Sequence, residues 1–185
     1  MLLEKLQSFV PYNEQEERDK AFMLSCLESM DVVYTRENPI AHMTASAWIV
    51  NEDRTKVLMA YHKIYDSWAW LGGHADGERD LLKVSLKEGM EESGIQNLSP
   101  VTEEIFSIEV LPVNGHMKKG EYISSHIHLN VTYLLEASEK EVLTIKEDEN
   151  SGVLWFTPEE ALKASTEPWF VENIYSKLIR KMQRE

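Results

Sequence analysis

Cysteine and positive charge are both scarce in this sequence. Cys26 is the one cysteine, so the chain cannot form an internal disulfide, and no metal-binding cysteine spacing surrounds it. A reducing compartment, the cytoplasm, is the expected location. The 19 Lys and Arg are outnumbered by 32 Asp and Glu, which gives a formal net charge of −13. This charge opposes non-specific binding to nucleic acid or to an anionic membrane, so neither is an expected partner.

Long apolar runs and internal repeats are also lacking. No stretch reaches the length needed to span a bilayer, and Glu4 and Lys5 interrupt what would have to be the apolar part of a signal peptide. The 185 residues, 43% of them hydrophobic, suffice for one domain with a substantial core. We predict a helical extension over residues 1–34 and one domain over residues 35–185.

The first third of the chain changes from helical to strand-like patterns. Asn13 followed by Glu16 has the spacing of a capping box, and hydrophobic residues then recur at helical intervals as far as residue 30. Pro39 disfavours helix at the residue before it. Residues 43–50 and 56–62 are rich in strand-forming residues and flank a polar turn, so we expect them to pair as a hairpin.

The rest of the chain mixes strands with helices. Residues 101–113 and 121–137 are predicted strands joined through a turn-forming loop. The second strand alternates apolar and polar side chains, which predicts one face in the core and the other in water. A short strand at 152–156 is followed by one helix and, after residue 168, by a final helix. This order predicts an α/β or α+β domain with a C-terminal helix.

Residues 80–93 are predicted to form a helix of about four turns in which acidic residues gather on one face. Glu88, Glu91 and Glu92 lie at i, i+3 and i+4, so they project together within a single turn. Like charges at this spacing weaken a helix, and a solvated acidic face is one interpretation of them. The other is a divalent-cation site, which requires convergent oxygen ligands on a rigid element.

Two glycines before this helix favour the second interpretation. Gly72 and Gly73 permit a sharp turn and a close approach of the backbone to a ligand. Gly94 stands at the end of the helix, where a left-handed cap is expected. A strand, a glycine turn and an acid-lined helix together form a compact pocket.

This stretch resembles the signature of the Nudix hydrolases, G-x5-E-x7-R-E-U-x-E-E-x-G-U, in which U is aliphatic. Aligned from residue 73, six of the nine specified positions agree and every spacing is kept. The agreeing residues are Gly73, Glu88, Glu91, Glu92, Gly94 and Ile95.

Three positions differ from the signature: Arg79 replaces the first Glu, Lys87 replaces Arg, and Gly89 replaces the aliphatic residue. The first Glu and the Arg are structural partners in the family, whereas Arg79 and Lys87 are two like charges. Lysine also lacks the bidentate fork of arginine, so we expect the glutamates to be less firmly oriented. Gly89 costs roughly 1 kcal/mol of helix propensity relative to Ala, which predicts that the helix packs closely on a sheet there.

The resemblance covers about residues 40–165 and carries implications for fold and activity. It implies a Nudix-type α/β/α sandwich with a mixed β-sheet. It also implies hydrolysis of the pyrophosphate bond of a nucleoside diphosphate linked to another moiety, with Mg²⁺ or Mn²⁺ as cofactor. Glu91 and Glu92 would then be metal ligands, and Glu88 a third ligand or the base that activates water. The Gly72 carbonyl would add a ligand.

Further site residues are predicted outside this stretch. Glu149, with Asp148 as second choice, lies in an acidic loop where some Nudix enzymes place an additional ligand or base, and a solvated turn is the alternative. A local basic group could receive a substrate phosphate, and the alternative is that its exposed loop lysines only make the surface soluble. A zinc site at the two strand histidines is less favoured, because no Cys or further His convincingly completes it. The predicted substrate contacts are His126, His128, Lys118, Lys119 and Arg36, with His42 as a further rim contact.

Two other functions compete with metal-dependent hydrolysis of a small-molecule nucleoside diphosphate derivative. A non-catalytic sensor that binds ADP-ribose or a similar nucleotide would explain Arg79 and Lys87, but it would have little need for all three glutamates. An isoprenoid diphosphate isomerase uses the same fold with a catalytic cysteine, for which Cys26 is poorly placed. The sequence does not determine the substrate. It does not determine the oligomeric state either, and a homodimer is possible.

Overall fold

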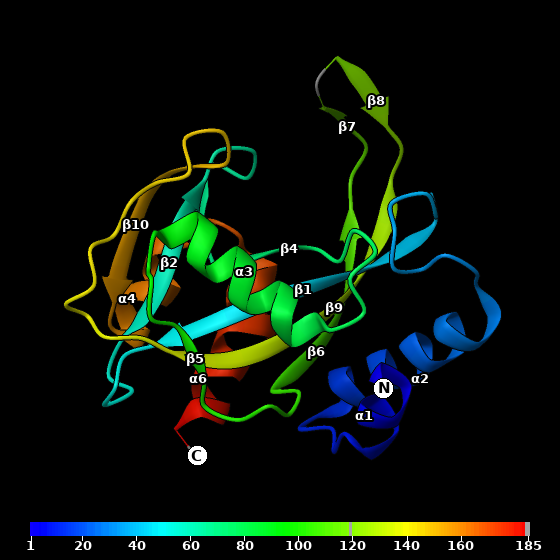
Figure 1. Ribbon diagram of the computed structural model, residues 1–185, viewed down its shortest axis with the longest axis horizontal. Coiled ribbons are helices and arrows are strands. Elements are labelled where there is room, and N and C mark those ends of the chain that lie inside the picture. Colours follow the sequence, from blue (N-terminus) through cyan, green and yellow to red (C-terminus); the bar gives the residue numbers. More distant parts are fainter. Residues whose placement is uncertain (119, 184–185) are drawn as a thin grey trace.

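The computed structural model describes residues 1–118 and 120–183. Its centre is a mixed β-sheet with strand order β10-β2-β1-β9-β5, in which β3 lies beside β2, β4 beside β1 and β6 beside β9 (Figure 1). β1 and β9 are parallel, and the other pairings of this sheet are antiparallel. The strands are β1 (Ala41–Val50), β2 (Val57–His62), β3 (Ser67–Ala69), β4 (Leu71–His74), β5 (Ser99–Pro100), β6 (Ser107–Val113), β9 (His126–Glu136) and β10 (Asn150–Phe156). A separate hairpin of β7 (His116–Lys118) and β8 (Glu121–Ile123) projects from the sheet.

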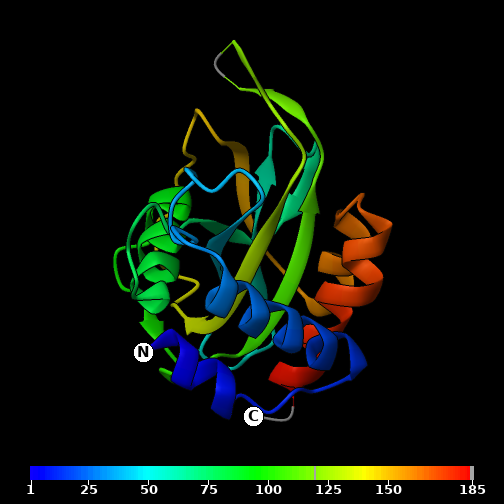
Figure 2. The same ribbon diagram turned by 90° about the vertical axis from the view of Figure 1, so that its right-hand side faces the viewer.

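Helices cover both faces of the sheet, as Figure 2 shows. α3 lies on one side, and the C-terminal helices lie on the other. The arrangement confirms the predicted α/β/α sandwich. The helical segments are α1 (Leu2–Ser8), α2 (Glu14–Ser29), α3 (Leu81–Ser93), α4 (Pro158–Ala164), α5 (Pro168–Phe170), the π-helix η1 (Val171–Tyr175) and α6 (Ser176–Met182). Within the described residues, no helix is long and apolar enough to cross a membrane.

The alternation of side chains along β1 divides the core into two parts, because successive strand residues point to opposite faces. Ala45, Ala47 and Ile49 pack in the core that α3 covers. Trp48 and Val50 pack in a second core with residues of η1 and α6. All ten residues of β1 are buried, as expected for a strand in the middle of a sandwich.

Several predicted elements are confirmed. Val50 pairs with Val57, so the first two strands form the expected antiparallel hairpin. The Asn13 side chain accepts a hydrogen bond from the Glu16 backbone N–H and caps α2. The reciprocal half of the capping box is absent, because the Glu16 carboxylate accepts from the Tyr12 backbone N–H instead.

The two long predicted strands are shorter than expected. Residues 101–106 form no strand, and Ser124 and Ser125 interrupt the run predicted at 121–137. The interruption separates the projecting hairpin from β9, which belongs to the central sheet.

The prediction of a water-exposed polar face on β9 is wrong. Asn130 and Thr132 are fully buried, and both side chains donate to the Glu109 carboxylate of β6 (2.8 and 2.9 Å). Thr44 and Ser46 of β1 donate to the Asn130 side-chain oxygen, at 2.9 and 3.0 Å. Alternation shows which residues share a face, but a polar face also becomes buried when its groups satisfy one another.

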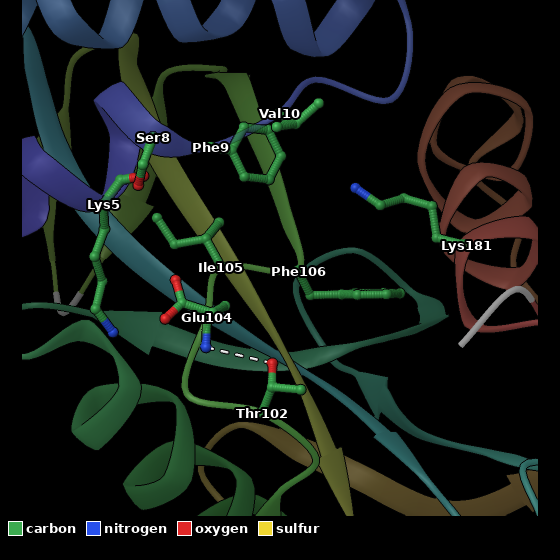
Figure 3. A pocket seen from close by; sticks show the side chains of 9 residues that line it. All are labelled: Lys5, Ser8, Phe9, Val10, Thr102, Glu104, Ile105, Phe106 and Lys181. Carbon is green, nitrogen blue, oxygen red and sulfur yellow. Dashed lines mark hydrogen bonds between the residues drawn. The ribbon is translucent and has the colours of Figure 1, made fainter.

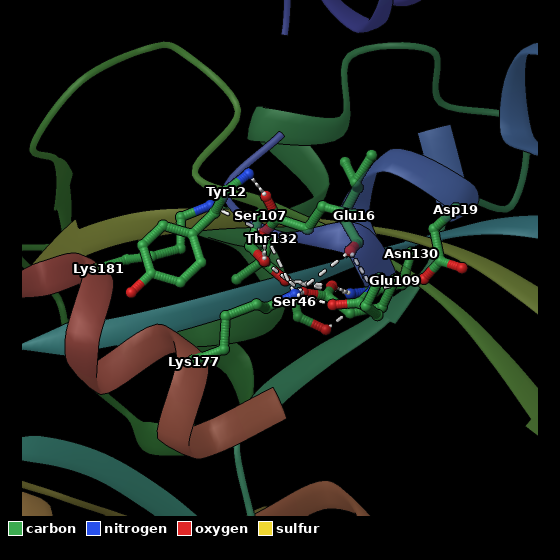
Figure 4. A network of polar contacts seen from close by, with 12 residues as sticks. Tyr12, Glu16, Asp19, Ser46, Ser107, Glu109, Asn130, Thr132, Lys177 and Lys181 are labelled. Atoms are coloured by element: carbon green, nitrogen blue, oxygen red, sulfur yellow. Dashed lines mark hydrogen bonds and ion pairs between the residues drawn. The ribbon is translucent and has the colours of Figure 1, made fainter. Parts of the chain in front are cut away.

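Lys177 of α6 extends its side chain into this polar layer (Figure 4). Its ammonium group lies 3.0 Å from Glu109 and 3.2 Å from Glu16 of α2, and all three side chains have no exposed surface. Lys181 adds a contact to Glu16 at 2.8 Å. The helical extension predicted at residues 1–34 is thus joined to the sheet and to the C-terminal helix by buried ion pairs.

Candidate functional site

The acidic helix α3 begins and ends where its sequence signals predict. The Asp80 side chain accepts from the Lys83 backbone N–H and caps the first turn, and Gly94 ends the helix in the left-handed conformation with φ 77°. Gly89 faces the sheet, where an added Cβ would lie 2.8 Å from the Leu98 side chain and 3.3 Å from that of Ile49. The close packing predicted at this glycine is confirmed, and it fixes the height of the acidic turn above the sheet.

Three carboxylates converge at the end of this helix. Oxygen atoms of Glu88, Glu92 and Glu149 lie within 4.8 Å of one another. Glu149 comes from the loop before β10, so the structure joins the acidic loop to the acidic helix. Asp148, the second choice in that loop, is exposed and lies outside the group.

Glu91 lies at the edge of this cluster. Its side chain is part-exposed and contacts two lysines, Lys87 at 3.4 Å and Lys146 at 3.5 Å. Lys146 also lies 3.0 Å from Glu149. The cluster therefore has cations along its rim and a more deeply buried acid inside.

Glu92 is that buried acid, with 6% of its surface exposed. Burial raises its pKa to about 8, and the nearby carboxylates of Glu149 and Glu88 act in the same direction. Lys146 and a hydrogen bond from the Gly72 backbone N–H offset part of this effect. A second bond, from the Asn150 side chain to the Glu92 carbonyl (2.9 Å), holds the loop against the helix.

The two glycines of β4 create the space for this arrangement. A Cβ at Gly73 would lie 2.6 Å from the carboxyl carbon of Glu88, and one at Gly72 would lie 2.5 Å from the Ala45 carbonyl oxygen. At Gly72 the clash is with the backbone of β1, so a side chain there would push the two strands apart. At Gly73 the clash is with the end of the Glu88 side chain, so a larger residue would displace that carboxylate.

The altered positions of the signature do not repel one another, because each finds a partner of its own. Lys87 contacts Glu88 at 3.0 Å, and this hydrogen bond is the main cause of its raised pKa. Arg79 stacks over the Tyr34 ring at 5.3 Å. Glu78, next to Arg79, forms an ion pair with Lys83 at 2.6 Å. Lys87 thus orients the cluster directly, without a partner at position 79.

The donor set fits a hard divalent cation. Carboxylate oxygens are the ligands that Mg²⁺ and Mn²⁺ prefer. A carboxyl group whose pKa is raised by neighbouring carboxylates marks excess negative charge, which a bound cation would relieve. Glu88, Glu92 and Glu149 could hold such an ion, with Glu91 beside them.

The predicted substrate contacts lie elsewhere. Arg36 forms a two-point ion pair with Asp76, with bonds of 2.8 and 2.6 Å. His126 and His128 lie at the start of β9, where their Nε2 atoms are 3.2 Å apart. Lys119 lies outside the described residues, and so does the side chain of Lys118.

Two residues that support the cluster were not predicted. Lys146 lies in the loop that carries Glu149, and Asn150 is the first residue of β10. In the sequence both stand in a polar stretch, where nothing distinguishes them from solvated loop residues. A cavity of about 320 Å³ lies away from the acids, between α1, the segment 102–106 and α6 (Figure 3). None of its lining residues is a predicted site residue.

Solved structures with the same fold have names of related chemistry. An Ap4A hydrolase from C. elegans is 18% identical and has a TM-score of 0.55, with 77% of this chain and 95% of that chain covered. A dihydroneopterin triphosphate pyrophosphohydrolase from E. coli is 14% identical, with a TM-score of 0.55 and coverage of 80% and 98%. A MutT protein from Methanosarcina mazei is 16% identical, with a TM-score of 0.53 and coverage of 78% and 96%. No curated protein matches the sequence.

A mixed sheet between helical layers, with a glycine strand leading into an acid-lined helix, defines an α/β/α protein with a cluster of carboxylates that could hold a divalent cation. The chain belongs to the Nudix hydrolase family, because the model of the NUDIX domain matches residues 41–178. The family and the enzyme class predicted from the sequence, a Nudix pyrophosphohydrolase, are confirmed.

Proposed function

We propose that this enzyme hydrolyses the pyrophosphate bond of a nucleoside diphosphate linked to another moiety, with Mg²⁺ or Mn²⁺ as cofactor. The observation that carries the proposal is the convergence of the carboxylates of Glu88, Glu92 and Glu149, whose oxygen atoms lie within 4.8 Å of one another around the buried Glu92. The names of two similar structures, an Ap4A hydrolase and a dihydroneopterin triphosphate pyrophosphohydrolase, support substrates of this kind.

The roles that we propose follow the resemblance to the Nudix signature. Glu92 and Glu91 hold the cation, Glu88 is a third ligand or the base, and the Gly72 carbonyl is a further ligand. Glu149, which approaches from the opposite loop, is the additional ligand or base. A bound divalent cation would polarise phosphate oxygens and lower the pKa of an attacking water. Lys87 and Lys146 keep the carboxylates oriented from the rim.

The partner that we propose is a small nucleoside diphosphate derivative. The net charge of −13 disfavours nucleic acid and anionic membranes as partners, and the single cysteine fits a cytoplasmic location. Arg36, Lys118 and Lys119 remain proposed phosphate contacts. For His126 and His128, phosphate contact is the alternative to the metal binding proposed below for this histidine group, and the phosphate titration described there decides between the two. A homodimer also remains a proposal.

Substitution of Glu92 by Gln tests the assignment. Nucleotide sugars, ADP-ribose, dinucleoside polyphosphates and oxidised nucleoside triphosphates would be screened with Mg²⁺ and with Mn²⁺, and release of phosphate or nucleoside monophosphate would be measured. We expect Glu92→Gln to lower turnover of the best substrate at least 100-fold, because the acid at the centre of the cluster is lost. The exposed Glu159→Gln variant is the matched control. Full activity of Glu92→Gln would refute the assignment.

The same screen separates the competing functions. If one nucleotide binds tightly but is not hydrolysed with either Mg²⁺ or Mn²⁺, the protein is a sensor. The isomerase alternative is disfavoured by the position of Cys26, which is buried in the core, where desolvation raises the pKa of its thiol. A buried thiol that resists ionisation is a poor catalytic group.

A further inference from the structure

Three histidines far apart in the sequence meet on one face of the sheet. His42 on β1 pairs in register with His128 on the parallel strand β9, and His74 ends β4, which pairs with β1 on its other side. One ring nitrogen from each lies within 4.8 Å of the others. His126 adjoins the group, with its ring stacked 4.8 Å from that of His42.

His42 carries a buried nitrogen that the protein leaves unsatisfied. Only 4% of its surface is exposed, so the predicted rim contact is wrong. Its Nδ1–H donates to the Asn38 carbonyl oxygen at 3.2 Å. Its Nε2 has no hydrogen-bond partner among the described residues. A buried polar atom without a partner is unfavourable, so it calls for an explanation.

The hydrogen bond of His42 has the form found at metal sites. A metal-binding histidine usually donates its second ring N–H to a carbonyl or carboxylate, which fixes the ring and leaves the other nitrogen as a lone-pair donor. His42 does this through Asn38. His126 does the same through its Nδ1 and the Ser124 carbonyl, at 2.8 Å.

The surroundings favour a cation over an anion. The three rings bring ring nitrogens within 4.8 Å of one another, and imidazole nitrogens are common metal ligands. The Nε2 of His42 is buried and has no partner among the described residues, so a lone pair there is free to bind a cation. The guanidinium of Arg36 is paired with the Asp76 carboxylate.

We propose that His42, His74 and His128 form a second metal site, for a borderline transition-metal ion such as Zn²⁺. Imidazole nitrogens suit Zn²⁺, and three protein ligands leave a fourth position open. With Zn–N bonds of about 2.0–2.1 Å, tetrahedral ligand atoms stand roughly 3.3 Å apart, so small ring rotations would close the site around the ion.

This site is distinct from the glutamate cluster. Gly73 lies against the Glu88 side chain, on the face of the sheet that carries the glutamate cluster. His74 is the next residue of the same strand, so its side chain points to the opposite face of the sheet. The two sites also differ in chemistry, since one offers carboxylate oxygens and the other imidazole nitrogens. The sequence pattern did not reveal the site, because His42 and His74 reach His126 and His128 only through the pairing of strands.

Metal binding to the metal-free full-length protein tests the proposal. Zn²⁺ would be titrated by calorimetry, and Co²⁺ by visible absorption, which is intense for tetrahedral nitrogen ligation and weak for octahedral oxygen ligation. Four variants would be compared with the wild type: His42→Gln, His128→Gln, His62→Gln and Glu92→Gln. His62 is the matched control, because it lies on β2 outside the group.

We expect one tight Zn²⁺ equivalent and an intense Co²⁺ spectrum in the wild type, in His62→Gln and in Glu92→Gln. His42→Gln and His128→Gln should bind Zn²⁺ about 100-fold more weakly and lose the Co²⁺ spectrum. Equal affinity in all the histidine variants, or loss only in Glu92→Gln, would overturn the proposal.

A measurement on the wild type covers the case in which a variant does not fold. Side-chain ¹⁵N NMR of the metal-free protein should show three histidines shifting on addition of one equivalent of Zn²⁺. Inorganic phosphate should leave them unchanged. Shifts with phosphate and none with Zn²⁺ would show that the group is an anion site instead.

Discussion

Two clusters of acidic side chains in this molecule differ in how far lysine side chains balance their negative charge. Glu16 and Glu109 lie in the polar layer behind the sheet, where Lys177 contacts both and Lys181 contacts Glu16. Glu88 and Glu92 lie at the end of α3, where the lysines stand at the rim. The first cluster has its cations built into the chain. The second has too few.

The pKa values express this difference. Burial alone would raise the pKa of Glu16, but the charges of Lys177 and Lys181 outweigh it and hold the pKa below the ordinary value. Burial raises the pKa of Glu92 to about 8, and Lys146 offsets only part of the effect. The lysines of the first cluster balance its carboxylates within the fold, whereas the carboxylates around Glu92 keep an excess of negative charge that a bound cation would relieve.

Removal of the lysine from the structural cluster should have the largest effect on stability. Lys177→Met leaves two buried carboxylates without their shared cation, and the loss of one partner of a buried ion pair costs about 3–5 kcal/mol. The free energy of unfolding would be measured by urea denaturation at pH 7. Lys140→Met, at an exposed loop position, is the control and should change stability by less than about 0.5 kcal/mol.

A loss below 1 kcal/mol in Lys177→Met would show that the polar layer is hydrated or rearranges easily. The contrast with the glutamate cluster would then fail. The double variant Lys177→Met/Glu109→Gln should recover part of the stability, because it removes one of the uncompensated charges.

In metal-free protein, the glutamate cluster should lower the free energy of unfolding as its carboxylates ionise, whereas the ion pairs of the first cluster raise it. The folded pKa of Glu92, about 8, lies above its ordinary value of 4.5. Below pH 4.5 the group is protonated in both states and costs nothing. As the pH rises from 4.5 to 8 the unfolded state ionises more readily, so stability falls, and above pH 8 the loss is complete.

Glu92→Gln should therefore be more stable than the wild type in EDTA at pH 8, by up to about 4 kcal/mol, since the folded pKa of about 8 lies well above 4.5 and each unit corresponds to about 1.4 kcal/mol. The advantage should vanish at pH 4 and shrink on addition of Mg²⁺, which stabilises only the wild type. Thermal unfolding at the two pH values measures this. A variant less stable than the wild type under all conditions would place Glu92 with the structural acids.

The acidic helix was predictable because its signals are local. The cap at Asp80, the stop at Gly94 and the spacing of three glutamates all lie within one element. Lys177 reaches Glu16 across most of the chain, and the histidine group forms only when β1 pairs with β9 and β4. Such contacts depend on strand order, which periodicity does not encode. The polar face of β9 was misread for the same reason, since the pattern cannot show what covers it.

Glu149 combines features of both clusters, so its substitution gives the finest test of the comparison. It lies 3.0 Å from Lys146, as a structural acid would, yet it also belongs to the group with Glu88 and Glu92. If it is a metal ligand, Glu149→Gln should weaken Mn²⁺ binding about 10-fold, the loss typical of a perturbed metal site. The neighbouring exposed Asp148→Asn removes an equal charge and should change the affinity less than about twofold. Titration of Mn²⁺ by electron paramagnetic resonance measures both. Equal effects of the two variants would mean that Glu149 influences Mn²⁺ binding only through its charge. Its ion pair with Lys146 would then serve to stabilise the loop.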